Sequence, residues 1–401
     1  MQTSMRLVIC IFFALLIACG PQPSREPQKI SYKITPQNNS FLVEMSHDGM
    51  GTITLPPDSK ASVNYRLLTG TKDYPIRYEV TPKSLEPRAQ DTVLTEDFFQ
   101  VVGHGFLACL GNNLNEKKSV QIIWNAPMRW KFANSFHADQ TEQNFEAKCS
   151  DLRKALYVGG YDLPIRKTWF GVAWVLKGKF DNLRPTQIEA ALTHNLLRVR
   201  KFWNAQPIPE YYFVSIRVIN SESLGGTAHF QSFQLNLPSK QESDLRLDYL
   251  ITHEYFHHWN GLKINLVPSS DTVDLDVWWF VEGFTDYYAY KLSELEPVEN
   301  KDFKNVKLEE LKRNYRHNHT YPGIPYVQGR HIANKFEDQI SRYSSGKELK
   351  HVMHEIIQRS QDPNFYLTRE NILKVLCEGQ YMSCAGAHAI LKDYVEQGIS
   401  L

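Results

Sequence analysis

The stretch His253-Glu254-Tyr255-Phe256-His257 decides how the centre of this 401-residue chain is interpreted. Two histidines four positions apart lie on one face of an α-helix, one turn apart. Both imidazoles can then bind one Zn²⁺ at about 2.0–2.1 Å. Glu254 lies beside the first histidine, where a carboxylate can take a proton from a metal-bound water. A helix with two ordinary histidines is the alternative, and the surrounding sequence has to decide between them.

The residues around this motif predict a helix. Ser243 or Asp244 can cap its beginning, and Gly261 can end it in a left-handed conformation. Helical spacing relates the following residues: Leu247, Leu250, Ile251, Glu254, His257 and His258. His258 points about 100° away from His257 around the helix, so we expect it to pack against neighbours rather than to bind metal.

A second segment, residues 278–288, can supply the third protein ligand that a hydrolytic metal site needs. Its sequence, Trp-Trp-Phe-Val-Glu-Gly-Phe-Thr-Asp-Tyr-Tyr, predicts a buried helix. A carboxylate in such surroundings is unfavourable unless it is paired or metal-bound, which makes Glu282 the candidate ligand. Asp286 follows on the same face, where it can accept a hydrogen bond from the outer nitrogen of a zinc-bound histidine. A solvated acidic pair is the alternative.

Together the two blocks resemble the glycyl-aminopeptidase family of gluzincin zinc metallopeptidases. The resemblance rests on residues 253–260, His-Glu-Tyr-Phe-His-His-Trp-Asn, and on residues 279–288. It implies a zinc peptidase with a general base at Glu254 and with zinc ligands at His253, His257 and Glu282. We expect Asn260 and Asp286 directly behind these ligands.

Weaker similarity extends over most of the remaining chain. Residues 120–127 resemble a strand of the family's N-terminal domain, and residues 393–398 resemble the end of its catalytic domain. Family members often carry a PDZ domain after that point, and none is expected here. The family usually has a tyrosine, early in a later helix, that supports the oxyanion. Tyr326 is the candidate for this role, and a core tyrosine is the alternative.

One block departs from the family pattern. Members typically show Gly-Gly-x-Glu-His on the strand that borders the cleft, whereas residues 225–229 are Gly-Gly-Thr-Ala-His. Gly225 and Gly226 still permit close approach by an extended peptide. Ala228 replaces the acid that could pair with a free substrate amine, which favours endopeptidase over aminopeptidase cleavage. Glu222 could substitute for that acid. His229 either lines the cleft or has a structural role.

The N-terminus predicts export. Residues 1–18 combine Arg6 with an apolar run at 7–18 that is too short for a stable membrane span. Residues 16–19, Leu-Ile-Ala-Cys, resemble a bacterial lipobox, so we expect a lipid on Cys19 and a proline-rich tether over residues 19–29. Ordinary signal cleavage with a chance cysteine is the alternative. Gly20 suits outer-membrane sorting in a Gram-negative host, which indicates a lipoprotein at the periplasmic face of the outer membrane or at the cell surface.

Export also places the chain in an oxidising compartment, where disulfides persist. Beyond the signal the chain has four cysteines, which allow three pairings. We favour Cys109 with Cys149 and Cys377 with Cys384. Buried free thiols are the alternative.

Charge and length narrow the function classes further. The 45 basic and 44 acidic residues balance, and no basic cluster indicates a nucleic-acid partner. A hydrophobic content of 42% allows two folded domains after the tether. Short alternating runs predict a β-rich domain, sandwich-like or saddle-shaped, at residues 30–165. Residues 166–401 form the expected thermolysin-like catalytic domain, in a protein that is α+β in class.

Within that second domain we expect strands at 167–175, 211–219 and 230–237, a helix at 186–203, and mainly helices from residue 244. The favoured function is Zn²⁺-dependent hydrolysis of peptide or protein substrates. The alternative is a surface lipoprotein that binds peptides or a partner protein and has lost catalysis, for which Ala228 is the motivation.

Overall fold

The computed structural model describes residues 28–48, 53–54, 62–69, 75–83, 91–111, 113–180, 183–205, 211–220, 224–239, 245–267, 277–297 and 324–396. The export signal, Cys19, most of the tether, Glu222 and the helix caps at residues 243–244 lie outside the described residues, so these expectations stay predictions. Within the described ranges, no helix is both long and apolar enough to cross a membrane.

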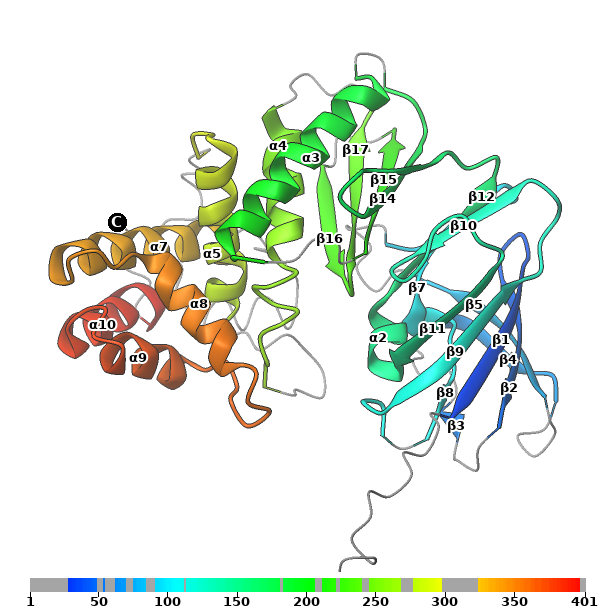
Figure 1. Ribbon diagram of the computed structural model, residues 1–401, viewed down its shortest axis with the longest axis horizontal. Coiled ribbons are helices and arrows are strands. Elements are labelled where there is room, and N and C mark those ends of the chain that lie inside the picture. Colours follow the sequence, from blue (N-terminus) through cyan, green and yellow to red (C-terminus); the bar gives the residue numbers. More distant parts are fainter. Residues whose placement is uncertain are drawn as a thin grey trace, which may run out of the picture.

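A six-stranded sheet begins the N-terminal part of the chain (Figure 1), with the strand order β11-β9-β1-β2-β5-β4. Its strands are β1 (Lys29–Pro36), β2 (Phe41–His47), β4 (Ser62–Leu67), β5 (Ile76–Pro82), β9 (Lys117–Trp124) and β11 (Glu142–Lys148). Every second residue of β9 is buried, Val120, Ile122 and Trp124 among them. This alternation is expected for a sheet with one face on a core.

A four-stranded sheet, ordered β10-β12-β7-β6, provides the second layer. Its strands are β6 (Val93–Leu94), β7 (Phe98–Val102), β10 (Trp130–Asn134) and β12 (Leu156–Tyr161). The short elements nearby are β3 (Ile53–Thr54), the 3-10 turn η1 (Gly103–Gly105), β8 (Cys109–Leu110) and α2 (Cys149–Lys154). Stacked rings of Trp124 and Phe132, 4.8 Å apart, join the two layers. A disulfide links Cys109 to Cys149, with Cα atoms 5.9 Å apart.

A five-stranded sheet, ordered β13-β14-β15-β17-β16, begins the second half of the chain. Its strands are β13 (Ile165–Lys167), β14 (Val172–Lys177), β15 (Tyr212–Ile219), β16 (Gly225–His229) and β17 (Ser232–Pro238). The single strand expected at 167–175 is wrong, because residues 168–171 turn between two antiparallel strands. β14, β15 and β17 are parallel, while β16 runs antiparallel at the edge.

Helices complete the second half. They are α3 (Pro185–Phe202), α4 (Leu245–Phe256), α5 (Trp278–Ser293), α7 (Ile324–Tyr343), α8 (Leu349–Arg359), α9 (Arg369–Glu378), α10 (Cys384–Ile390) and the π-helix η3 (Leu391–Glu396). The helices α3 and α4 lie beside the five-stranded sheet (Figure 1). A disulfide links Cys377 to Cys384, from the last turn of α9 to the start of α10. The α+β class predicted from the sequence is confirmed.

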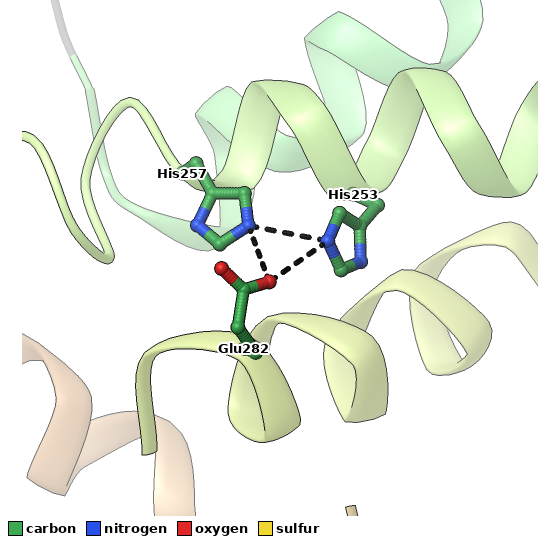
Figure 2. Close-up of side chains that lie close together, drawn as sticks. All are labelled: His253, His257 and Glu282. Carbon is green, nitrogen blue, oxygen red and sulfur yellow. Dashed lines mark hydrogen bonds and ion pairs between the residues drawn. The ribbon is translucent and has the colours of Figure 1, made fainter. Parts of the chain in front are cut away.

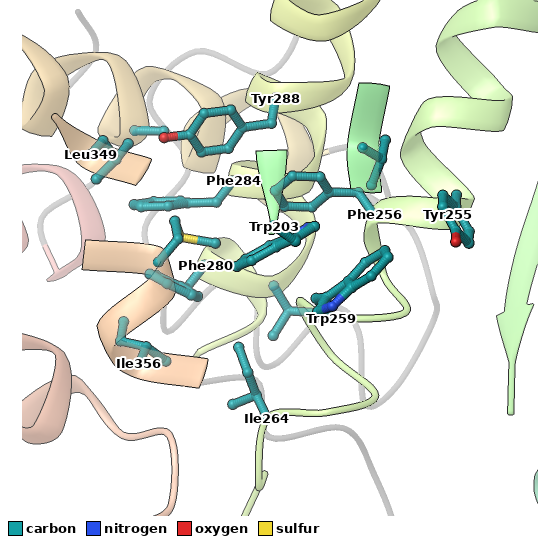
Figure 3. Close-up of a cluster of buried hydrophobic side chains, with 14 of the residues drawn as sticks. Trp203, Tyr255, Phe256, Trp259, Ile264, Phe280, Phe284, Tyr288, Leu349 and Ile356 are labelled. Atoms are coloured by element: carbon teal, nitrogen blue, oxygen red, sulfur yellow. The ribbon is translucent and has the colours of Figure 1, made fainter. Parts of the chain in front are cut away.

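An aromatic cluster packs behind α4 and α5 (Figure 3). The ring of Phe256 lies 5.0 Å from Trp203 and 5.4 Å from Tyr288, while Phe280 and Phe284 stack 4.2 Å apart. These buried rings pack α4 and α5 against each other and against α3. Because tightly packed cores resist volume changes, the cluster holds the two helices in a fixed relation.

Buried contacts join the N-terminal sheets to the five-stranded sheet. The side chain of Gln100 on β7 donates to Gln234 on β17 and accepts a 2.6 Å hydrogen bond from Ser215 on β15. A buried apolar cluster crosses the same junction and includes Phe98, Leu156, Val175 and Phe213. A buried polar group that is fully bonded specifies one arrangement, so the two halves meet in a defined orientation.

Candidate metal centre

Three side chains from two helical segments converge at one point (Figure 2). The Nε2 atoms of His253 and His257 are 3.1 Å apart, and Oε2 of Glu282 lies 3.5 Å from the first and 3.2 Å from the second. These three residues form the candidate metal-binding group of the described part of the chain. Donor atoms bound tetrahedrally to Zn²⁺ at 2.0–2.1 Å would be about 3.3 Å apart, so the spacing fits that ion.

The protonation of His257 shows why a cation belongs there. Its Nδ1 lies 2.9 Å from the carbonyl oxygen of Asn260, which can only accept, so Nδ1 carries the proton. When a metal cation replaces the second proton of this imidazole, the lone pair of Nε2 is directed towards His253 and Glu282. Electron-rich atoms at such distances repel one another unless a positive charge lies between them. The donor set therefore suits a divalent cation.

Charge and burial act against each other at these ligands. Burial would lower the pKa of His257, but the neighbouring carboxylate of Glu282 raises it to about 9. Burial likewise opposes the charge of Glu282, but the two imidazoles outweigh it and hold the pKa of this carboxyl below its ordinary value. The carboxylate of Glu282 therefore stays negatively charged, and its charge stabilises positive charge in the pocket.

The local backbone explains the placement of His257. The sequence predicts a helix that contains the whole motif. The helix α4 instead ends at Phe256, one residue before His257. The N–H of His257 still donates to the carbonyl of His253 at 3.3 Å, which preserves the one-turn relation between the two imidazoles. Gly261 then adopts a φ of 134°, where a side chain would be strained.

Asn260 ties this turn to α5. Its side-chain amide donates to the backbone carbonyl of Val281 and to the hydroxyl of Thr285, each at 3.0 Å. Its backbone carbonyl accepts from the imidazole of His257. Such outer contacts fix the orientation of a metal-binding imidazole. Asn260 therefore lies directly behind the candidate ligands, and so does Thr285, which no sequence motif marks.

The hydrogen bond expected between Asp286 and a ligand histidine is not formed. Asp286 instead accepts from the hydroxyl of Tyr249 and from Nη1 of Arg330, the latter at 2.7 Å. The local Asn260 carbonyl already occupies Nδ1 of His257, and Nδ1 of His253 is buried with no hydrogen-bond partner. Tyr249 and Arg330 each lie four residues from a site residue, a spacing that indicates a shared helix face but not a contact with Asp286.

Glu254 and the glycine strand lie against each other. Glu254 is buried, and burial raises the pKa of its carboxyl. A Cβ atom added to Gly226 on β16 would approach Oε1 of Glu254 to 2.6 Å, whereas one at Gly225 would meet open space. The glycine at position 226 is therefore what allows the edge strand to lie beside the candidate base. Strand alternation places Ala228 on the same face as Gly226.

Tyr326 lies at the same centre. It is in the first turn of α7, and its ring stacks on His253 at 5.6 Å between centroids. Burial together with the nearby carboxylates of Glu282 and Glu254 holds the pKa of the phenol well above its ordinary value. The side chain is therefore a protonated donor beside the metal-binding group. His258, by contrast, packs among rings, 4.6 Å from Trp259.

His229 is buried at the end of β16, and its Nε2 has no hydrogen-bond partner. Burial, with the nearby His104, lowers its pKa from 6.5 to about 3. Below pH 6.5 the imidazole of His229 therefore binds a proton in the unfolded chain but stays neutral in the folded protein. The free energy of unfolding should then fall as pH drops from 6.5 towards 3.

The variant His229→Gln should lose less stability than the parent protein between pH 7 and pH 4.5. Urea unfolding at the two pH values measures the difference. His388→Gln, at an exposed position of α10, is the matched control and should behave like the parent. Equal pH dependence in the parent and in His229→Gln would contradict the assignment.

Comparison with known proteins supports this geometry. Residues 246–349, which include the histidine motif, Glu282 and Tyr326, match the family model of M61 glycyl aminopeptidase. No curated protein sequence matches the chain.

Several solved structures share the fold. One is an aminopeptidase N family protein from Idiomarina loihiensis, with a TM-score of 0.71 and 16% identity over 93% of this chain and 76% of that one. An M1 zinc metallopeptidase from Deinococcus radiodurans has a TM-score of 0.57 and 12% identity over 94% and 95% of the two chains. The aminopeptidase A of Legionella pneumophila has a TM-score of 0.55 and 11% identity over 94% and 50%.

At these identities the structural likeness establishes the fold, and the family match assigns the segment that carries the site. Residues 246–349 thus match the M61 glycyl aminopeptidase family, and this match together with the shared fold supports a metallopeptidase.

Proposed function

We propose that this protein hydrolyses peptide bonds with a Zn²⁺ ion held by His253, His257 and Glu282. The observation that carries the proposal is the convergence of three donor atoms within 3.5 Å, with Glu254 beside them. When bound, the ion supplies Lewis-acid chemistry, lowering the pKa of a water towards about 7 and polarising the scissile carbonyl.

The chain's own residues supply the proton transfers. Glu254 takes the proton of the attacking water and later delivers it to the leaving amine, a task suited to a carboxyl whose pKa is raised. Tyr326 donates a hydrogen bond to the oxygen that gains negative charge. Its raised pKa keeps the phenol protonated, so it can act as a donor throughout.

We place the substrate backbone along β16. This strand is at the edge of the sheet, where an extended peptide can add as a further strand. Gly225 leaves open space and Gly226 brings the strand against Glu254. Both features support close approach of a peptide backbone to the catalytic carboxylate.

The position of the cut depends on Ala228. Its methyl group lies on the site-facing side of β16 and cannot hold a substrate ammonium group. This observation favours endopeptidase cleavage as the second candidate, beside the aminopeptidase activity for which the matching family is named.

One digest separates these functions. The purified, zinc-loaded protein is incubated with a peptide library in free-amine and N-acetylated forms, followed by mass spectrometry. We expect cleavage that disappears when a chelator removes the metal. Cleavage of free-amine peptides alone identifies an aminopeptidase, while cleavage of both forms identifies an endopeptidase. No product from either form would contradict catalysis and favour a peptide-binding protein.

A further inference from the structure

Three helices around the metal centre share a two-layer arrangement. Each carries a candidate site residue and, one turn away, a member of a second polar cluster. The pairs are His253 with Tyr249 on α4, Glu282 with Asp286 on α5, and Tyr326 with Arg330 on α7. Residues four apart on a helix lie on one face. The second cluster, Tyr249, Asp286 and Arg330, is therefore stacked directly on the site layer, and we call it the supporting triad.

Asp286 is the centre of the supporting triad. Its carboxylate accepts from the Tyr249 hydroxyl and, at 2.7 Å, from Arg330, so it bonds both α4 and α7 to α5. Only 2% of Asp286 and 7% of Arg330 are exposed. The ring of Tyr290 covers the ion pair, 5.1 Å from the guanidinium and 4.5 Å from the ring of Tyr249. A buried charge held in this way is strongly constrained, because separating the pair would leave each charge desolvated.

The backbones of α5 and α7 touch between the two layers. A Cβ atom added to Gly283 would lie 2.1 Å from Cα of Gly329, and one added to Gly329 would lie 2.0 Å from the carbonyl oxygen of Trp279. Small residues let helices approach closely. Such a contact has no interlocking side chains, so by itself it does not define how α7 is rotated against α5. A hydrogen bond or ion pair nearby, which depends on direction, can define the rotation of α7 against α5.

We propose that Arg330, held by Asp286, is a positioning residue that sets the rotation of α7 and thereby aims the hydroxyl of Tyr326 at the metal centre. This inference rests on the proposed function for its effect on turnover. Arg330 contacts Asp286 one turn beyond the point where the ring of Tyr326 stacks on His253. On the two sides of the glycine contact, α7 is thus bonded to α5 through Arg330 and packed on α4 through Tyr326.

The first test removes the charge and keeps the length of the side chain. Arg330→Met should lower kcat by about 10-fold to 100-fold, because a displacement near 1 Å of a catalytic group costs about that much. KM should change less than about 2-fold and bound zinc should remain stoichiometric. Arg330→Lys keeps the charge and should recover part of kcat.

A matched control comes from the same helix pair. Lys291 on α5 and Glu337 on α7 form a more exposed ion pair, with Nζ and Oε1 3.3 Å apart. Lys291→Met removes this pair and leaves the supporting triad intact, so kcat should equal that of the parent protein. Thermal unfolding of both variants shows whether any effect comes from loss of folded protein.

A double-mutant cycle tests whether Arg330 acts through Tyr326. Tyr326→Phe removes the donor. In that background Arg330→Met should have no further effect on kcat. An additive loss in the double variant would overturn the proposal, as would parental kcat in Arg330→Met or a loss that accompanies lost zinc.

A readout without activity separates this inference from the proposed function. With 3-fluorotyrosine at position 326, the ¹⁹F resonance should move in Arg330→Met and stay in place in Lys291→Met. If the parent protein hydrolyses no peptide, the proposed function fails, and the resonance still decides the positioning role. An unmoved resonance in Arg330→Met would overturn that role.

Discussion

Replacing Glu254 with Gln should reduce peptide hydrolysis by about 10³-fold while zinc stays bound, within the range that general-base catalysis usually contributes. Gln keeps the shape and a carbonyl oxygen beside Gly226 but cannot take a proton. The three donor atoms of His253, His257 and Glu282 are unchanged, so the metal site should remain intact. Initial rates on a cleaved peptide, together with metal analysis of the same sample, measure both parts of this expectation.

Stability provides the control for that variant. Glu254 is 6% exposed, and burial opposes its charged form, so the neutral Gln should leave the melting temperature equal or raise it. Glu370→Gln, an exposed position on α9, makes the same chemical change and should alter neither rate nor metal content. Parental kcat/KM in Glu254→Gln would show that another group takes the proton.

The second large effect concerns the carboxylate ligand. Glu282→Gln should weaken zinc binding by more than about 100-fold, because loss of contacts behind a ligand already costs 10- to 100-fold. Removing this charge leaves two buried imidazoles without the carboxylate that lies 3.5 Å and 3.2 Å from them. Competition with a chromophoric chelator gives the affinity directly, and hydrolysis should fall in parallel at limiting zinc.

Glu337→Gln is the matched control for the ligand variant. It removes a carboxylate from α7 that pairs with Lys291 and lies outside the metal-binding group. Its zinc affinity should equal that of the parent protein. A Glu282→Gln variant with parental affinity would remove Glu282 from the ligand set and with it the proposed arrangement of the site.

Structural features that depend only on neighbouring residues can be predicted from the sequence. The four-residue spacing of His253 and His257 requires only one helical turn, so the pair could be predicted without knowing what surrounds it. The apolar run at 278–288 likewise predicts the buried helix α5. Because both segments could be identified, Glu282 could be proposed as the partner even though 25 positions separate it from His257.

The partner of Asp286 could not be found in this way. Its hydrogen bonds reach 37 positions back to Tyr249 and 44 positions forward to Arg330. The expected histidine contact competes with the carbonyl of Asn260, which is only three residues from His257 and forms its bond within one turn. A local acceptor costs less chain entropy to hold in place than a distant carboxylate, so it takes the imidazole proton.

By itself, then, the sequence determined the candidate metal ligands, the candidate general base and the α+β class. These follow from residue types and short spacings along the chain. Only the tertiary structure decided that Gly226 brings β16 against Glu254 and that Gly283 and Gly329 bring α5 against α7. The physical reason is that a glycine in the sequence shows only that a side chain is absent, not which group lies against the backbone there. The backbone or carboxylate that fills the space comes from another element, and packing alone brings the two together.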